Sequence, residues 1–307
     1  MAGEYDIIII GGGAAGFTAG LYAARDRCRA LLLERFSAGG QVLNCPHIEN
    51  YPGFPDGVAG YSLGPLLQQQ ATNLGLEMKL AEVHSVHLDG ETKVLQTDDG
   101  EVRARALIIA TGSSFSKLNI PGEEEFIGRG VSHCASCDGA FFMDQPVVVI
   151  GGGDAALDEG LHLTEYVSSV TVIHRREELS ACRLLRERAQ ANEKLTFRFN
   201  TVVKAIEGNG EVQRVQLEDV KTGERSALDV TGAFIFIGLT PNTQFLNGLV
   251  SLNDKGQLVT DLSMRTSVPG IFAVGDVRAE SSRQLVSAAG DGATAALAAV
   301  QYLRTRD

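Results

Sequence analysis

The chain has 307 residues, of which 44% are hydrophobic and 21% are charged. These proportions are typical of a folded soluble protein, and they exclude extended disorder and a disulfide-stapled miniprotein. The formal charge of −11 repels polyanions, so we expect neither nucleic acid nor an anionic membrane as a partner. The N-terminal residues lack the pattern of a secretory signal peptide, and the predicted location is therefore the cytoplasm.

The first predicted element is a strand, turn and helix near the N-terminus. Four isoleucines at 7–10 predict a central strand that is buried on both faces. Gly11, Gly13 and Gly16 follow with the spacing that lets a backbone turn approach a pyrophosphate, which the helix N-terminus then binds. Glu34 ends the next predicted strand, where a carboxylate would bind the ribose of an adenosine without a 2′-phosphate.

The middle of the chain carries a pair of cysteines, Cys134 and Cys137, followed directly by Asp138. Two thiols at this spacing predict a redox-active dithiol, and Asp138 is a candidate proton donor and acceptor. Zinc would need about four ligands, whereas the other three cysteines are scattered along the chain. We therefore predict no metal site and expect Cys28, Cys45 and Cys182 to be packing or surface thiols.

A second strand, glycine turn and helix begin at residue 147, with Gly151, Gly153 and Ala156 in the fingerprint positions. The strand that follows ends in His174, Arg175 and Arg176, with no acid at the place that Glu34 occupies in the first unit. Guanidinium groups suit a 2′-phosphate, which predicts NADPH. The alternative is that the two arginines form surface ion pairs with acids at 177 and 178.

The last predicted elements are strands at 232–238 and 270–276 and a helix from about 284 to 303. Asp276 could bind a polyol, and the helix start at Arg283 and Gln284 could stabilise a reduced flavin. The predicted fold is α/β, with two Rossmann-like dinucleotide-binding domains, the second inserted in the first. The FAD-binding domain is expected at 1–115 and 247–307, and the NADPH-binding domain with the dithiol at 116–246.

Over essentially its whole length the sequence resembles the low-molecular-weight, bacterial-type thioredoxin reductases, which are FAD-dependent pyridine nucleotide-disulfide oxidoreductases. The resemblance rests on both glycine fingerprints, on Cys134–Gly139, and on the segments 39–41, 49–53, 110–112, 174–176, 275–276 and 283–284, in this order. It implies a homodimer that uses NADPH and FAD to reduce thioredoxin or a thioredoxin-like protein. It also implies that Cys137 faces the flavin, that Cys134 attacks the partner disulfide, and that the inserted domain rotates about its two linkers.

The residues expected to act in catalysis are Cys134, Cys137 and Asp138. The residues expected to contact FAD are Gly11, Gly13, Ala14, Ala15, Gly16, Glu34, Gly40, Gln41, Asn50, Ala110, Thr111, Gly112, Gly275, Asp276, Arg283, Gln284 and Leu285. The residues expected to contact NADPH are Gly151, Gly153, Asp154, Ala155, Ala156, His174, Arg175 and Arg176.

The sequence departs from the family pattern at three places. Ser180 stands where a third arginine is usual, the segment 42–46 replaces a threonine-rich run, and Gly160 replaces a helical alanine. Two alternatives therefore stay open. One is a related flavoenzyme that uses NADH, ferredoxin or oxygen, and the other is a flavin-binding redox sensor without turnover.

Overall fold

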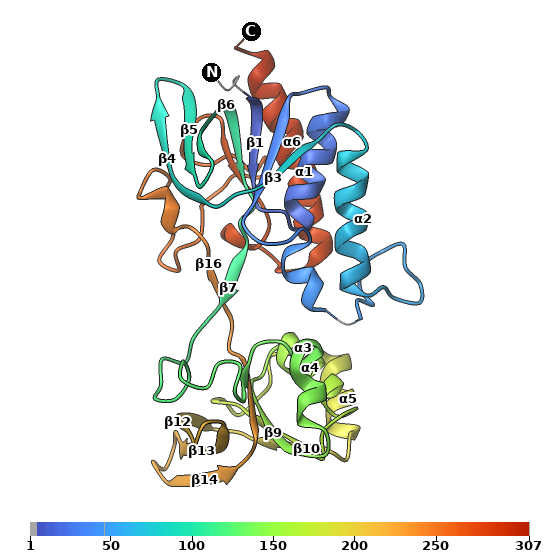
Figure 1. The fold of residues 1–307 in the computed structure, drawn as a ribbon, viewed down its shortest axis with the longest axis vertical. Coiled ribbons are helices and arrows are strands. Elements are labelled where there is room, and N and C mark those ends of the chain that lie inside the picture. The colour runs from blue at the N-terminus through green and yellow to red at the C-terminus, as the bar shows by residue number, and fades with distance from the viewer. Residues whose placement is uncertain (1–4, 46, 307) are drawn as a thin grey trace. The chain divides into compact units, whose positions relative to one another are not determined.

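The computed structural model describes residues 5–45 and 47–306, except for the side chains of residues 44, 136 and 137. The chain forms two compact units (Figure 1). Unit 1 consists of residues 1–114 and 240–307, and unit 2 consists of residues 115–239. Unit 2 is therefore inserted in unit 1.

Unit 1 is built on a seven-stranded sheet with the order β3-β2-β1-β6-β5-β4, in which β17 also pairs with β6. The strands β1, β2, β3, β6 and β17 pair in parallel, and β4 and β5 complete the sheet as antiparallel strands. The strand bounds are β1 Tyr5–Ile10, β2 Ala30–Glu34, β3 Glu77–Leu80, β4 Val83–Asp89, β5 Thr92–Thr97, β6 Gly100–Ile109 and β17 Ile271–Ala273. The helices are α1 Ala14–Arg25, α2 Gly60–Thr72 and α6 Leu285–Arg304, with short 3-10 turns η1 Gly40–Asn44, η3 Gln244–Leu246 and η4 Gly275–Val277.

The isoleucine run of β1 lies at the centre of this sheet and is buried on both faces. Ile7 and Ile9 pack in one hydrophobic cluster together with residues of α1 and α6, while Ile8 and Ile10 pack in the cluster on the opposite face. Helices α1 and α6 lie side by side (Figure 1). They approach so closely at Gly292 that a Cβ there would clash with the carbonyl oxygen of Ala15. The predicted strand therefore packs against the two helices, which are rich in small residues, beside the first glycine turn.

Unit 2 repeats the plan on a five-stranded parallel sheet with the order β11-β10-β9-β15-β8. A three-stranded antiparallel sheet, β12-β13-β14, is added to it. The strand bounds are β8 Val131–Ser132, β9 Pro146–Gly151, β10 Ser169–Ile173, β11 Leu195–Arg198, β12 Thr201–Gly208, β13 Val212–Asp219, β14 Arg225–Asp229 and β15 Gly232–Phe236. The helices are α3 Ala135–Asp138, η2 Gly139–Phe142, α4 Asp154–Leu163 and α5 Arg183–Ala191.

The two connections between the units contain the strands β7 (Ser113–Phe115) and β16 (Leu239–Pro241), which pair as a two-stranded sheet. The sequence placed the second join after residue 246, whereas the compact units divide after residue 239. The reason lies in the segment that follows β16. Leu246 is 1% exposed and packs in the hydrophobic core of unit 1, so η3 belongs to that unit.

Candidate active site

The first glycine turn joins β1 to α1 in unit 1. Gly11 has a φ of +106°, and a Cβ there would clash with the carbonyl oxygen of Ala110. Gly16 packs against the backbone of Gly11 in the same way. At Gly13, the N-cap of α1, a Cβ would meet no atom within 4 Å, and the first helical turn carries no acid. There is therefore open space beside Gly13 at the start of α1, where Ala14 and Ala15 begin the helix, and the N-terminus of a helix suits a pyrophosphate.

Glu34 ends β2 beside this turn. One of its carboxylate oxygens accepts a hydrogen bond from the Gly12 backbone N–H at 2.7 Å, and the other accepts one from Phe36 N–H at 2.9 Å. These bonds fix the carboxylate at the carboxyl end of the strand. Each oxygen keeps a second lone pair for a donor such as a ribose hydroxyl.

The segment 39–41 runs along the same turn. Gly39 N–H donates to the Gly12 carbonyl at 2.7 Å, and Gly40, with a φ of +59°, lies against the backbone of Gly13. The Gln41 amide donates to the Ser113 carbonyl at 2.9 Å. Predicted residues of the FAD site that are distant in sequence therefore line one edge of unit 1.

Two further predicted residues touch each other directly. The Asn50 side-chain amide donates to the Gln284 side-chain carbonyl at 3.1 Å, although 234 positions separate them in the sequence. Gln284 is the N-cap of α6, which begins at Leu285. This bond attaches the loop before α2 to the start of the last helix.

Asn242 is a residue of this region that the sequence did not indicate. Its side-chain amide donates to the Thr111 carbonyl at 2.9 Å, and its backbone carbonyl accepts from the Thr111 hydroxyl at 2.8 Å. It also receives the Ser114 hydroxyl at 2.7 Å and donates its backbone N–H to Gly112. Three of these four bonds fix the predicted Ala110–Gly112 segment after β6, and the fourth reaches Ser114.

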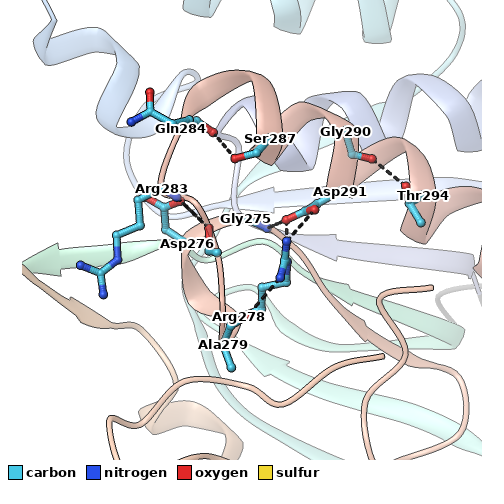
Figure 2. Close-up of polar contacts among 11 residues, drawn as sticks. Gly275, Asp276, Arg278, Ala279, Arg283, Gln284, Ser287, Gly290, Asp291 and Thr294 are labelled. Atoms are coloured by element: carbon cyan, nitrogen blue, oxygen red, sulfur yellow. Dashed lines mark hydrogen bonds and ion pairs between the residues drawn. The ribbon is translucent and has the colours of Figure 1, made fainter. Parts of the chain in front are cut away.

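A second set of residues that the sequence did not indicate lies around the turn that contains Asp276 (Figure 2). Asp291 on α6 is 7% exposed, receives the Gly275 N–H at 3.0 Å and forms a two-pronged ion pair with Arg278. The Asp276 carboxylate itself accepts only a 3.3 Å bond from the Ser281 hydroxyl among the bonds of the described residues. Burial raises the pKa of Asp276 above its usual value, and the Ser281 bond and nearby Arg283 oppose this only in part. A ligand hydroxyl would supply the missing donor.

The second glycine turn joins β9 to α4 in unit 2. Gly151 is in the extended positive-φ region at +154°, and Gly153 is the N-cap of α4 without a side-chain cap. The carbonyl of the intervening Gly152 accepts from Ser180 N–H at 2.8 Å and from the Ser180 hydroxyl at 3.1 Å. Asp154 at the helix start receives the Cys182 N–H at 2.6 Å. Hydrogen bonds therefore hold the segment after β10 against the second glycine turn. Ala155 and Ala156 follow this turn in the first part of α4.

The basic segment after β10 consists of one buried and two exposed side chains. His174 donates its Nε2–H to the Glu178 carbonyl at 3.0 Å, and its burial lowers its pKa, which favours the neutral imidazole. Arg175 and Arg176 are exposed. Within the described residues Glu177 forms an ion pair with Lys221, and no ion pair joins Arg175 or Arg176 to Glu177 or Glu178. Both guanidinium groups are therefore available to an anionic ligand.

Cys134 lies between β8 and α3, and it is held in a disulfide. Its backbone N–H donates to the Ser132 hydroxyl at 3.0 Å, and the next N–H, of Ala135, donates to the Glu159 carboxylate at 2.8 Å. His133 donates its Nδ1–H to the Ile235 carbonyl at 3.0 Å and stacks on Phe115. The predicted second cysteine, Cys137, lies in α3, and its side chain is outside the described residues. Asp138 ends α3.

The other cysteines, Cys28, Cys45 and Cys182, are not held in disulfides. Burial raises the pKa of Cys28 to about 11, so this thiol stays protonated at neutral pH. In the described part of the chain there is no cluster of three or more histidine, cysteine or acidic side chains that could hold a metal ion. No described helix is long and apolar enough to cross a membrane.

The chain has two dinucleotide-type glycine turns, of which one is followed by a carboxylate and the other by two exposed guanidinium groups. With a disulfide in the second unit, these features define a class of protein. This class is the two-dinucleotide flavoenzymes that pass electrons from a nicotinamide nucleotide to a disulfide. A family model described as pyridine nucleotide-disulphide oxidoreductase matches residues 5–293, and the chain belongs to this family.

Curated and solved relatives agree with this assignment. A thioredoxin reductase of Mycolicibacterium smegmatis is 43% identical over 304 residues, which cover 99% of this chain and 98% of that protein. A thioredoxin reductase of Bacillus subtilis is 45% identical and covers 97% of this chain and 95% of its own length. The crystal structure of Lactococcus lactis thioredoxin reductase superimposes with a TM-score of 0.96 at 44% identity, over 98% of this chain and all of that one.

The predicted family, the α/β fold and the FAD and NADPH cofactors are thereby confirmed. The described residues also fit these groups on physical grounds. The first turn of α1 carries no acid, and neither glycine turn leaves room for a side chain where it packs against the sheet, at Gly11 and Gly16 in the first turn and at Gly151 in the second. The chain is an oxidoreductase.

Proposed function

We propose that the chain is an NADPH-dependent thioredoxin reductase. The overall reaction takes NADPH, one proton and an oxidised thioredoxin disulfide to NADP⁺ and reduced thioredoxin dithiol. One observation carries the proposal, namely that the Cys134 disulfide lies in the same unit as the second glycine turn and its two exposed arginines. A nicotinamide site and a disulfide in one unit require a carrier of electrons in the other.

Unit 1 is the proposed FAD-binding domain. FAD, when bound, supplies a carrier that accepts a hydride from NADPH and delivers two electrons to a disulfide. In our proposal the N-terminus of α1 binds the pyrophosphate, Glu34 binds the adenosine ribose, and Asp276 accepts a hydroxyl of the flavin side chain. The burial that raises the pKa of Asp276 supports this role, because a bound hydroxyl would donate to that carboxylate.

Unit 2 is the proposed NADPH-binding domain. Gly153 and the start of α4 would bind the pyrophosphate, while Arg175 and Arg176 would bind the 2′-phosphate by charge-assisted hydrogen bonds. The ion pair between Glu177 and Lys221 supports this proposal, since it keeps one neighbouring carboxylate away from the two guanidinium groups.

We assign the disulfide to Cys134 and Cys137. After its reduction, the Cys134 thiolate attacks a sulfur of the thioredoxin disulfide and forms a mixed disulfide, and the released thioredoxin sulfur takes a proton. Cys137 then attacks Cys134, which expels the second thioredoxin sulfur as a thiolate and restores the disulfide. Asp138 is the proposed group that supplies and accepts these protons. Because the dithiol must meet the flavin and then the partner, unit 2 must change its position between the two steps.

The proposed partner is thioredoxin or a thioredoxin-like protein, and the proposed assembly is a homodimer in the cytoplasm. The names of the relatives support the partner. The acidic composition supports a role away from nucleic acid and anionic lipid.

An anaerobic spectroscopic titration of the FAD-loaded protein tests the proposal. Rapid bleaching of the flavin by NADPH, followed by reoxidation on addition of oxidised thioredoxin, is the expected result. Bleaching by NADH or reduced ferredoxin but not by NADPH would favour a related reductase with another donor. Reoxidation by oxygen alone, with no effect of thioredoxin, would indicate a dithiol oxidase, and an absence of bleaching with any donor would indicate a sensor.

A further inference from the structure

The turn that carries Cys134 is held by hydrogen bonds on both sides of the cysteine. The Ser132 hydroxyl accepts the Cys134 N–H at 3.0 Å and donates to the Cys134 carbonyl at 3.2 Å. Ala135, the next residue, is fully buried and begins α3. Two hydrogen bonds with Ser132 therefore fix the backbone of Cys134, and the next backbone donor along the chain is the Ala135 N–H.

This donor is taken by a carboxylate from another element. Glu159 lies on α4, 24 positions further along the chain, and its Oε2 accepts the Ala135 N–H at 2.8 Å. The Glu159 side chain is half-buried. A carboxylate thus lies beside the peptide bond that joins Cys134 to Ala135.

From this geometry we propose that Glu159 is a positioning residue for the attacking thiol: it holds the turn through Ala135 and its charge opposes ionisation of Cys134. The inference rests on the proposed function, in which Cys134 attacks the partner. A nearby like charge disfavours a thiolate. The other titratable residues nearby are His133 before α3, Cys137 and Asp138 in α3, and Asp154, Asp158 and His162 on α4. The turn η2, which also packs against α3, contains none.

The consequence concerns the reactivity of the thiolate. A more basic thiolate attacks a disulfide faster per ionised molecule, and it is a poorer leaving group once the mixed disulfide has formed. Glu159 would therefore lower the amount of Cys134 thiolate at neutral pH and increase the nucleophilicity of the part that is ionised.

The test is the pH profile of Cys134 alkylation in the FAD-loaded Cys137→Ser protein, with and without Glu159→Gln. Iodoacetamide is the probe, and the Cys134 peptide is quantified by mass spectrometry. The glutamine keeps an oxygen that can accept the Ala135 N–H but removes the charge. We expect the midpoint of the profile to fall by about one pH unit. At neutral pH the rate should rise about threefold, because a tenfold gain in thiolate is partly offset by lower nucleophilicity.

Two controls separate this role from a structural one. Exposed Cys182 is an internal standard in the same samples, and Asp158→Asn makes the same change of net charge at the neighbouring position of α4. The alkylation rate of Cys182 should be the same with and without Glu159→Gln, and Asp158→Asn should leave the Cys134 profile unchanged. An unchanged midpoint in Glu159→Gln would overturn the proposal, even if Glu159→Ala lowered the melting temperature. Failure of the unsubstituted enzyme to reduce thioredoxin would contradict the proposed function, whereas the alkylation profiles would still decide the effect of Glu159.

Discussion

The Arg278 guanidinium donates to both carboxylate oxygens of Asp291, at 2.7 Å from Nε and 3.0 Å from Nη2 (Figure 2). Both side chains are largely buried, with exposed fractions of 15% and 9%. The carboxylate also receives the N–H of Gly275 at 3.0 Å. The pair therefore links α6 to the turn that contains Asp276. The Asp291 carboxylate has a charged partner within the fold, whereas burial disfavours the charged form of the Asp276 carboxylate.

Asp291→Asn should destabilise the protein. The amide keeps an oxygen for Gly275 but loses the charge that satisfies Arg278, and hydrogen bonds to charged groups contribute about 1.5–3 kcal/mol each. We expect a loss of about this size in the free energy of unfolding, measured by urea denaturation. Arg278→Lys should lose part of the same energy, because lysine cannot form the two-pronged bond. Equal stability of Asp291→Asn and the unsubstituted protein would show that the pair contributes nothing.

Asp276→Asn should have the opposite effect on the protein without FAD. Since burial raises the pKa of this carboxyl, its ionised form is unfavourable in the folded state, and stability is lost as the pH rises through that pKa. The variant should therefore melt at a higher temperature than the unsubstituted apoprotein at pH 7, and the difference should narrow as the solution is acidified.

The same substitution should weaken FAD binding by about tenfold or more, because a charged acceptor is replaced by a neutral one. Fluorescence titration of the apoprotein with FAD measures this loss. A lower melting temperature of the Asp276→Asn apoprotein, or unchanged FAD affinity, would contradict the role assigned to Asp276. The two variants together distinguish the roles of the two carboxylates: Asp276 is expected to bind a ligand, and Asp291 is expected to stabilise the fold.

Lys93 predicts a dependence of stability on alkaline pH. This residue is 1% exposed, and its ammonium donates to the carbonyls of Glu91 and Arg105, both at 2.8 Å. Among the described residues no carboxylate forms an ion pair with it. Burial lowers its pKa to about 8 from the ordinary value of 10.5. Between these values the unfolded chain binds more protons than the folded protein, so the contribution of Lys93 to stability rises with pH.

We therefore compare unsubstituted protein with Lys93→Met at pH 7.5, 8.5 and 9.5 by urea denaturation. The difference in unfolding free energy should shift in favour of the lysine by at most about 1.4 kcal/mol per pH unit. Other titrating groups cancel in the difference. Lys255→Met, at an exposed lysine, is the control that should show little change. A difference that is constant across this range would mean that Lys93 titrates normally.

The sequence predicted the parts of the fold that depend on local patterns. The isoleucine run, the glycine spacing and the alanine-rich helix each reflect burial or backbone geometry within a few residues, and β1, α1 and α6 lie where these patterns placed them. Asn242, Asp291 and Glu159 were not predicted, because their roles depend on contacts with distant segments. Asn242, for example, bonds to a residue 131 positions away. Asp291 did carry a signal, since it is an acid within an alanine-rich helix.

Cofactor preference tests the basic segment after β10. Two guanidinium groups without ion pairs to Glu177 should favour NADPH over NADH by about ten- to a hundredfold in kcat/KM. Ser180→Arg should widen this preference if the position faces the 2′-phosphate. The Ser180 hydroxyl bond to Gly152 would be lost, but the backbone N–H bond to the same carbonyl remains. Leu184→Arg, at an exposed position of α5, adds the same charge and should have little effect. Equal kcat/KM for the two nucleotides would contradict the prediction.

The two cysteines should have different roles that single substitutions reveal. With Cys137 as the inner sulfur, Cys134→Ser should abolish thioredoxin reduction but leave reduction of the flavin by NADPH intact. The remaining Cys137 thiolate beside oxidised flavin should give a long-wavelength charge-transfer band in the visible spectrum. Cys137→Ser should also be inactive, without this band, and should trap thioredoxin as a mixed disulfide on Cys134, because no second thiol is present to release it.

Non-reducing electrophoresis with oxidised thioredoxin detects this trapped complex, and the Cys134→Ser protein is its matched control. Cys182→Ser, which removes an exposed free thiol outside the pair, should leave both turnover and the spectrum unchanged. A charge-transfer band in Cys137→Ser instead of Cys134→Ser would reverse the assignment of inner and outer sulfur. Full thioredoxin reduction by both single variants would show that the dithiol is not catalytic, since a lone thiol at either position cannot accept two electrons and return to a disulfide.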